Sequence, residues 1–498
     1  MLNLREPLTA RLLELAAAPI AVEHDAVAAQ RVKSGFEYLD RCFSDGRSIY
    51  GATTGFGPLV TFGGREVPED QCDNTVQHLT AGQGPELPRE VVRATMLARV
   101  WTLSRGLSGI SPHTFDALVA ALGTSFAPVV PALGSVGASG DLVPMAHIVQ
   151  CLRGVGQAWV GDEKLPAAEA LRRAGLSPLP LTGRDALALV NGTAVTSAVG
   201  GLAVASLRRS FETALALSAL LTDVLGAAPA FLAPPLLEAF GHPTAAAVGE
   251  RLGYWLEGTA PTGERPLQEP YSIRCVPQLA GAARSALDWA GDVVHRDLNG
   301  VSDNPLFFEE QDLVAHGGNF FGQPTAFAAD LLSMVATQLG NLAERQLDLL
   351  VDPVRNTGLP PMLSPRPGEQ HALQGVQLVT TAIVVAMRRA CVPASVQSIP
   401  TNLHNQDVVP FGTQAALTAL DQAHSLRLLH GSLALGLRQA AHLRPGTRAP
   451  RCHALLEVLS AAIPPVVTDR ALDVDVRVAA DVLDSAVAEH LERVREVR

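Results

Sequence analysis

Four segments of the chain combine glycine with polar and aromatic side chains in a way that suggests chemistry. They are residues 50–57 (YGATTGFG), 134–142 (GSVGASGDL), 268–275 (QEPYSIRC) and 401–407 (TNLHNQD). The chain has only four tyrosines, and two of them, Tyr50 and Tyr271, fall inside these segments. Core packing alone does not explain a tyrosine on a glycine-flanked loop, so we expect a functional role for both.

The second segment can build a reactive group from its own backbone. Glycines on both sides of Ala138-Ser139 allow the chain to fold back on itself. The amide nitrogen of Gly140 can then attack the carbonyl carbon of Ala138, and loss of water closes a five-membered imidazolone ring. Dehydration of Ser139 leaves an exocyclic methylene, which makes the ring a strong electrophile that no ordinary side chain provides.

The same segment has two plainer interpretations. Pattern alone favours a tight turn before a helix capped by Asp141. A phosphate-binding loop is the other interpretation. It is disfavoured because the segment lacks the Lys-Ser/Thr pair of a P-loop and the G-x-G-x-x-G spacing of a dinucleotide-binding loop.

Long helices are expected to position these segments. Residues 327–351 place apolar side chains at spacings of three and four, and residues 201–228 and 412–443 have the same character. Such Ala- and Leu-rich helices are typical of a large bundle. Residues 44–66 and 131–147 are rich in Gly, Thr, Ser and Pro and are predicted to be loops.

We therefore predict a mainly α fold with one boundary near residue 200. Residues 201–498 would form a long-helix bundle body. Residues 1–200 would form a mixed, loop-rich N-terminal lobe that carries the Tyr50 loop and the Ala138-Ser139-Gly140 tripeptide.

The composition and the net charge limit the classes of molecule that the protein could bind. Hydrophobic residues make up 47% of the 498 and charged residues 17%, which predicts a large core and is compatible with surface covered by other subunits. The net charge is −11, and the 38 Lys and Arg residues form no cluster, which disfavours nucleic acid and anionic membranes as partners.

The cysteines and apolar runs predict a cytoplasmic protein. Six widely spaced cysteines without a C-x-x-C pair suit reduced thiols, and no His/Cys/Asp cluster has metal-ligand spacing. Charged residues interrupt the apolar N-terminal stretch, which indicates an amphipathic helix and not a signal peptide. The apolar runs at 224–237 and 374–387 are too short to span a bilayer.

The segment GSVGASGDLVPMAH resembles the signature of the aromatic amino acid ammonia-lyase and aminomutase family, whose members use a methylidene-imidazolone prosthetic group. Further blocks resemble the family in the same order over nearly the whole chain: YGATTGFG, ALVNGT (188–193), YSIRC, SDNP (302–305), GGNFFGQ (317–323) and NQD (405–407). The pattern is closest to tyrosine ammonia-lyase. The resemblance implies a group formed autocatalytically from Ala138, Ser139 and Gly140, and no metal or diffusible cofactor.

The resemblance also implies catalytic roles. Tyr50 is expected to be the general base, which needs a phenolate held by its surroundings, on a loop that closes over the substrate. Attachment of the substrate amine to the electrophile made from Ser139 would improve the leaving group. Arg274 is expected to grip the substrate carboxylate, and Tyr271 and Asn191 to hold the oxygen of the prosthetic group and the polar end of the substrate.

The residues expected to bind the substrate are Gly57, His78, Leu79, Asn191, Arg274, Phe320, Asn405 and Gln406. The His78-Leu79 pair resembles tyrosine-selective lyases, because a buried imidazole would bond the para-hydroxyl group of tyrosine. Phenylalanine would leave that imidazole unpaired at a cost of about 1–3 kcal/mol. The alternative for His78 is an ordinary helix histidine bonded to a backbone carbonyl. Phe320 would wall the ring pocket, with a core phenylalanine as its alternative.

Gln406 bears on the same choice, because histidine-specific relatives carry Glu at this point and a neutral amide suits a phenol or phenyl ring. We therefore expect elimination of ammonia from tyrosine to give para-coumarate, with phenylalanine to cinnamate also possible, and histidine ammonia-lyase disfavoured. An aromatic amino acid 2,3-aminomutase and a non-catalytic helical scaffold are the other candidates. The family usually forms homotetramers with shared active sites, which we expect here. Residues 371–375 (HALQG) depart from the family pattern and leave the pocket shape open.

Overall fold

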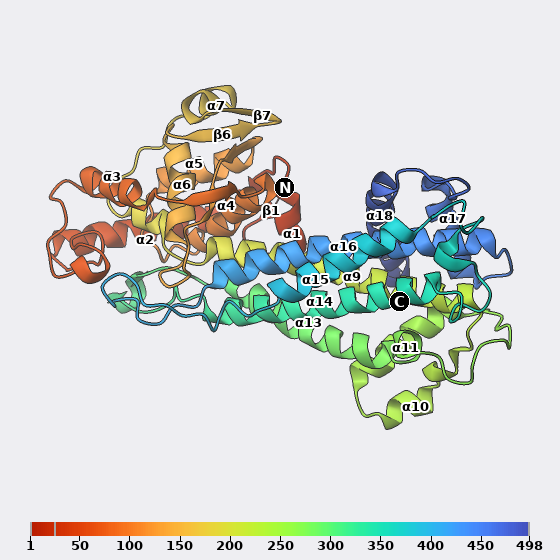
Figure 1. The fold of residues 1–498 in the computed structure, drawn as a ribbon. Helices are drawn as coiled ribbons and strands as arrows, with labels where there is room; N and C mark the ends of the chain where they lie inside the picture. The colour runs from red at the N-terminus through yellow and green to blue at the C-terminus, as the bar shows by residue number, and fades with distance from the viewer. Residues whose placement is uncertain (1, 24–25, 497–498) are drawn as a thin grey trace. The chain divides into compact units, whose positions relative to one another are not determined.

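The computed structural model describes residues 2–23 and 26–496, and these form a mainly helical fold (Figure 1). Contacts divide the chain into two units. Unit 1 comprises Met1–Ala205, Ala290–Asp330 and Pro393–Leu417, and unit 2 comprises Ser206–Trp289, Leu331–Val392 and Thr418–Arg498. The predicted mainly α fold with long helices is confirmed. The predicted boundary near residue 200 treated each part as continuous, whereas two later segments of the chain return to unit 1.

Unit 1 has helix α4 at its core. Its helices are α1 (Ala10–Leu15), α2 (Ala26–Ser44), α3 (Pro68–Leu79), α4 (Arg89–Leu103), α5 (Pro112–Leu122), α6 (Leu142–Leu152), α7 (Ala167–Arg173) and α8 (Asp185–Val190). Every residue of α4 from Val91 to Leu103 is buried, and α1 and α5 pack on it. The burial includes Arg93 and Arg99, whose guanidinium groups hydrogen-bond to backbone carbonyls in place of water.

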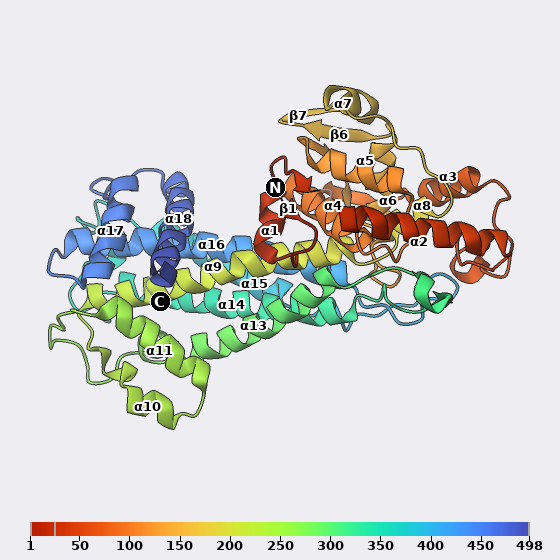
Figure 2. The same cartoon turned by 180° about the vertical axis from the view of Figure 1, so that it is seen from behind.

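Short strands complete unit 1. They are β1 (Leu2–Asn3), β2 (Val22–Glu23), β3 (Gln83–Glu86), β4 (Phe126–Pro128), β5 (Pro131–Leu133), β6 (Gln157–Val160), β7 (Glu163–Pro166), β8 (Leu306–Phe308) and β9 (Leu313–Ala315). Strands β4, β6 and β7 form an antiparallel sheet beside α7 (Figures 1 and 2). Strand β5 pairs with β3, and α6 begins at Leu142, so the prediction of a loop throughout residues 131–147 was wrong at both ends.

Four long helices contribute residues to both units: α9 (Ala194–Leu225), α13 (Val276–Asn299), α14 (Gln323–Val351) and α16 (Gly412–Leu443). Unit 2 also contains α10 (Pro234–Ala239), α11 (Pro243–Leu256), α12 (Tyr271–Arg274), α15 (Gln374–Ala390), α17 (Pro450–Ala462) and α18 (Asp473–Glu496).

Polar contacts join neighbouring helices of the bundle in unit 2. Gln346 of α14 donates to Ser218 Oγ of α9 over 2.9 Å. Gln422 of α16 donates to the Met387 carbonyl of α15 over 2.8 Å. The range predicted from periodicity for residues 412–443 coincides with α16, which confirms this long helix.

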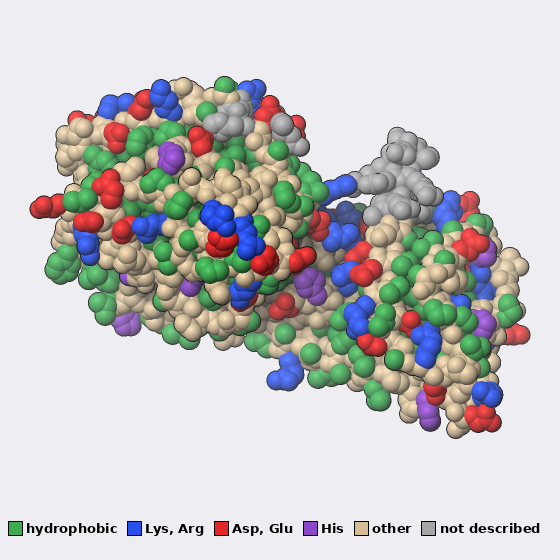
Figure 3. Space-filling model, turned by 90° about the horizontal axis from the view of Figure 1, so that it is seen from above, with side chains coloured by type: hydrophobic (Ala, Val, Ile, Leu, Met, Phe, Trp, Pro, Cys, Tyr) green, Lys and Arg blue, Asp and Glu red, His purple; other side chains and the backbone are tan. Residues whose placement is uncertain are grey.

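None of the helices in the described part of the chain is long and apolar enough to cross a membrane. On the face shown in Figure 3, side chains of Lys and Arg are interspersed with those of Asp and Glu.

Candidate functional site

The Ala138-Ser139-Gly140 tripeptide lies on a turn between β5 and α6. Gly137 and Gly140 adopt left-handed backbone conformations, with φ angles of +71° and +73°. Ser139 is half-buried, and its Oγ accepts a hydrogen bond of 2.7 Å from Gln406 Nε2. The fold thus brings together two predicted site residues that lie 267 positions apart in the sequence.

The backbone of Gly140 packs directly on that of Gly192. The two residues form an isolated parallel β-bridge, and the Asp141 N–H donates to the Gly192 carbonyl over 2.8 Å. A Cβ atom at Gly140 would lie 2.1 Å from the Gly192 oxygen. Position 140 therefore requires glycine for this close approach as well as for its φ angle.

Asp141 joins this segment to two long helices. It is fully buried and directly precedes α6, but its side chain makes no capping bond to that helix. The prediction that Asp141 caps the helix is therefore wrong. The carboxylate instead accepts hydrogen bonds from Ser135 Oγ over 2.7 Å, Thr196 N over 2.8 Å and Thr413 Oγ1 over 2.6 Å. These bonds fix the C-terminal side of the tripeptide.

Tyr50 is held at both its backbone and its ring. The Gly57 N–H donates to Tyr50 Oη over 2.7 Å, and the Tyr50 N–H donates to His316 Nε2 over 3.3 Å. Burial raises the pKa of Tyr50 more than the Gly57 bond lowers it. The groups that this chain places around Tyr50 therefore favour the neutral phenol, and the base role of Tyr50 stays a prediction. His316 was missed by the sequence analysis, although it directly precedes the GGNFFGQ block.

Phe56 lies between Tyr50 and His78. Its ring centroid is 6.0 Å from that of Tyr50 and 5.8 Å from that of His78. His78 is exposed on the last turn of α3, and its Nδ1 lies 2.7 Å from the Asn74 carbonyl. In the single chain the imidazole is therefore exposed and makes the backbone bond of an ordinary helix histidine, and its contact with a substrate ring stays a prediction. Because a carbonyl only accepts, Nδ1 carries the proton and Nε2 is left as an acceptor. Leu79, half-buried, ends the helix.

Residues 401–406 contact both the tripeptide and the Tyr50 loop. Gln406 reaches Ser139, and a Cβ atom at Gly57 would lie 2.6 Å from Asn402 Nδ2. Asn405 is exposed, and its N–H donates to the Asn402 carbonyl over 3.1 Å. Left-handed φ angles of +57°, +53° and +61° occur at Asn402, Leu403 and His404. Asn402 was not predicted, although its place in TNLHNQD was the available signal.

Asn191 offers an unpaired acceptor next to Gly192. It is buried at the end of α8, and its Oδ1 has no hydrogen-bond partner among the described residues. Unpaired buried polar atoms are rare, so this oxygen suits a ligand with an N–H or O–H group. Together with the dehydratable hydroxyl of Ser139 and the side-chain-free Gly140, it fits a methylidene-imidazolone site.

Phe320 lies on the turn before α14. The side chain is half-buried. The turn itself contacts the tripeptide segment, because the Gly322 N–H donates to the Gly137 carbonyl over 3.3 Å. This contact places the GGNFFGQ block beside the tripeptide segment, and the role of the Phe320 ring stays a prediction.

Tyr271 and Arg274 form a second cluster, in unit 2. The Arg274 guanidinium lies 4.7 Å above the centre of the Tyr271 ring, and its Nε donates to the Glu269 carbonyl over 2.8 Å. Glu269 is itself buried and paired with Arg265, whose Nε donates to it over 2.9 Å. Tyr271 is 70% exposed. The phenol is therefore available to a partner molecule.

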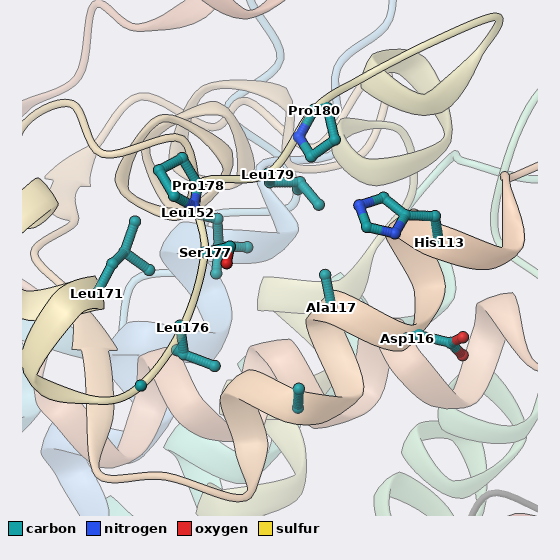
Figure 4. Close-up of a pocket in the computed structure, with 12 residues that line it drawn as sticks. His113, Asp116, Ala117, Leu152, Leu171, Leu176, Ser177, Pro178, Leu179 and Pro180 are labelled. Atoms are coloured by element: carbon teal, nitrogen blue, oxygen red, sulfur yellow. The ribbon is translucent and has the colours of Figure 1, made fainter.

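A cavity of about 290 Å³ occurs elsewhere in unit 1, between α5 and residues 175–180 (Figure 4). Its lining is mainly apolar and includes Leu152, Leu171, Leu176 and Leu179. None of the residues that line it is a predicted site residue. The described part of the chain brings together no group of three His, Cys, Asp or Glu side chains that could hold a metal ion.

Comparison with known proteins identifies the family. Residues 8–461 match the aromatic amino acid lyase family. The chain is 39% identical to a tyrosine ammonia-lyase of Cereibacter sphaeroides over 93% of this chain and 92% of that protein. It is 37% identical to a histidine ammonia-lyase of Symbiobacterium thermophilum over 91% of this chain and 90% of that protein. The fold matches a tyrosine aminomutase from Streptomyces globisporus with a TM-score of 0.91 at 28% identity, covering 99% and 98% of the two chains. The chain belongs to the aromatic amino acid lyase family.

Proposed function

We propose that the chain eliminates ammonia from an aromatic L-amino acid, using a methylidene-imidazolone built from Ala138-Ser139-Gly140. The observation that carries this proposal is the packing of Gly140 on the Gly192 backbone, with the Ser139 hydroxyl held by Gln406. The group, once formed, supplies an electron-poor carbon that accepts the substrate amine and makes it a better leaving group.

The residues of the chain would bind the substrate and move its proton. Tyr50 would remove the β-proton, with its Oη fixed by the Gly57 N–H. Because burial raises the pKa of Tyr50, the positive charge of the substrate ammonium group would help to form the phenolate. Asn191 Oδ1 would accept an N–H from the same ammonium group. Arg274 would bind the carboxylate through both oxygens.

For the substrate ring we propose tyrosine first, giving para-coumarate. His78 Nε2 is an acceptor, which suits the phenol O–H, whereas phenylalanine has no donor to offer. Gln406 donates to the Ser139 hydroxyl, which would be lost when the prosthetic group forms, so its neutral amide would then be free to face a phenol or phenyl ring. Histidine is the second candidate, because its ring N–H can also donate to Nε2 and because histidine ammonia-lyases match the chain at nearly the same identity as the tyrosine enzyme.

Parallel ultraviolet assays with tyrosine, histidine and phenylalanine test this proposal. We expect para-coumarate from tyrosine and a kcat/KM for phenylalanine lower by about 10-fold or more, since one hydrogen bond is lost. Urocanate from histidine at a higher kcat/KM would select the second candidate. Chiral chromatography of the tyrosine reaction separates an aminomutase, which would yield β-tyrosine. An enzyme inactive on all three would contradict the proposal.

We also propose a cytoplasmic homotetramer in which subunits share active sites. Helix α15 exposes Leu378, Val379 and Val385, whose burial by another copy would be favourable. Subunit mixing tests the shared site: Ser139→Ala and Arg274→Ala variants, each inactive, are co-refolded. If the subunits share sites, part of the activity returns. No recovery in mixed tetramers would contradict sharing.

A further inference from the structure

A buried guanidinium of α4 lies beneath the turn that carries Asn191. Arg99 is 1% exposed, and its Nε donates to the Ala188 carbonyl over 2.9 Å. Its Nη1 donates to the Ser302 carbonyl over 2.9 Å, and its Nη2 makes a second, short bond to Ala188. Arg99 therefore joins the end of α8 to the segment before Asp303, which lies some 200 positions away.

The charge of this guanidinium is only partly balanced. Asp303 accepts two bonds from Arg184, of 2.8 and 3.0 Å, and lies 3.6 Å from Arg99 Nη2. All three side chains are buried, so two cations share one carboxylate. Burial lowers the pKa of Arg99 to about 10, against the opposing effect of Asp303. Such an arrangement is costly to desolvate, and stability alone gives little reason to keep it.

Three backbone segments are stacked above Arg99 without side chains between them. Gly192 has a φ angle of +110°, and a Cβ there would lie 2.2 Å from the Ser302 oxygen and 2.9 Å from Arg99 Nη1. On its other side Gly192 packs on Gly140. The Thr193 N–H also donates to Ser302 Oγ over 2.9 Å. Arg99 thus hydrogen-bonds to the Ser302 carbonyl, on which Gly192 packs. Gly192 in turn packs on Gly140.

We infer that Arg99 is a positioning residue for formation of the prosthetic group, an inference that rests on the proposed function. In that reaction the Gly140 nitrogen forms a bond to the Ala138 carbonyl carbon. The Ala138 oxygen leaves as water with the N–H protons of Gly140 and Ser139, which leaves a C=N bond. The Ser139 Cα proton and its hydroxyl then leave as a second water. Attack requires the Gly140 nitrogen to stay close to the Ala138 carbonyl carbon. The packing of Gly140 on Gly192 prevents the nitrogen from moving away.

Arg93 provides a matched control on the same helix. It is also buried, at 2% exposure, and its guanidinium also bonds only to backbone carbonyls, those of Ala16, Ala18, Leu122, Thr124 and Phe126. Those carbonyls belong to residues 16–18, which follow α1, and to residues 122–126, from the last residue of α5 to the first of β4. Arg93 makes five such bonds and Arg99 three, so Arg93→Lys disturbs at least as many buried hydrogen bonds as Arg99→Lys, at a different place.

The test follows water loss by intact-protein mass as the full chain folds directly after cell-free synthesis, because chain purified from cells would already have lost both waters. Wild type and Arg93→Lys are expected to become two waters lighter at the same rate. Arg99→Lys is expected to lose water about 100-fold more slowly, as a misplaced reacting group would. Melting temperatures would show that both variants fold. Equal rates for Arg99→Lys and Arg93→Lys would overturn the inference while leaving the proposed function intact.

Two further outcomes are decisive. If Arg99→Lys does not fold, Ser302→Ala carries the test, because it removes only the two bonds that the N–H and the hydroxyl of Thr193 donate to Ser302 Oγ. Slower water loss in Ser302→Ala supports the inference, and a wild-type rate overturns it. A wild-type chain that never loses two waters would overturn both the inference and the proposed function.

Discussion

Replacing Gly192 by alanine tests the close packing on which the site depends. The new Cβ would lie 2.2 Å from the Ser302 oxygen, which is backbone and cannot swing away, and the φ angle of +110° disfavours any L side chain. Backbone strain of about 1–3 kcal/mol and overpacking of about 1–3 kcal/mol give a total near 4 kcal/mol. Relief of the clash must move Gly192 away from Ser302 and disturb Gly140 on its other side.

Gly161→Ala is the control, because Gly161 has a similar left-handed requirement, with a φ angle of +60°, and no atom within 4 Å of a Cβ there. Its cost is about 1–2 kcal/mol. An unfolding entropy of about 2.1 cal/mol/K per residue makes 1 kcal/mol worth about 1 °C in a chain of 498 residues. Calorimetry should therefore show Tm lowered by about 4 °C for Gly192→Ala and by about 1–2 °C for the control.

The same preparations report on chemistry through their intact mass. We expect Gly161→Ala to be two waters lighter than its sequence and Gly192→Ala to retain both waters. If Gly192→Ala loses both waters and has the same Tm as Gly161→Ala, the reasoning that backbone packing at Gly192 positions the tripeptide is refuted.

Three further predictions concern the roles of single side chains. Because burial raises the pKa of Tyr50, only a small fraction is phenolate at neutral pH, so kcat/KM should rise from about pH 7 to about pH 9. Tyr50→Phe should lower kcat by about 100-fold or more while the protein still loses both waters, and a flat pH profile of the wild type would contradict the base role. His78→Phe should reduce the preference for tyrosine over phenylalanine by about 5- to 150-fold in kcat/KM ratios, and an unchanged ratio would show that Nε2 does not bind the ring. Arg274→Lys should raise KM by about 10-fold, since the bidentate fork is lost, and Arg284→Lys, whose side chain is 43% exposed on α13, is its control.

The helices of the bundle could be predicted because their signal is local. Apolar spacing of three and four fixes a helix wherever it is sustained, which is why residues 412–443 match α16. The return of residues 290–330 and 393–417 to unit 1 has no local signal, because it depends on packing between distant parts of the chain.

The site was predictable in its residue types and less so in its contacts. Glycine at position 140 signalled a backbone that folds tightly, but its partner Gly192 is known only from the fold. The sequence predicted that the His78 imidazole binds the substrate. It did not show that Nδ1 of this ring hydrogen-bonds to the Asn74 carbonyl, four residues earlier. Arg99 carried no motif, because its partners are main-chain carbonyls that any sequence could provide.

The most direct test of the account is peptide mapping by mass spectrometry of the freshly purified wild-type chain. The fragment that contains Ala138, Ser139 and Gly140 should be two waters lighter than its sequence, and all other fragments should have their full mass. The corresponding fragment of Ser139→Ala should not lose the second water, because the hydroxyl is missing. A wild-type fragment at its full, uncyclised mass in active protein would contradict the central claim.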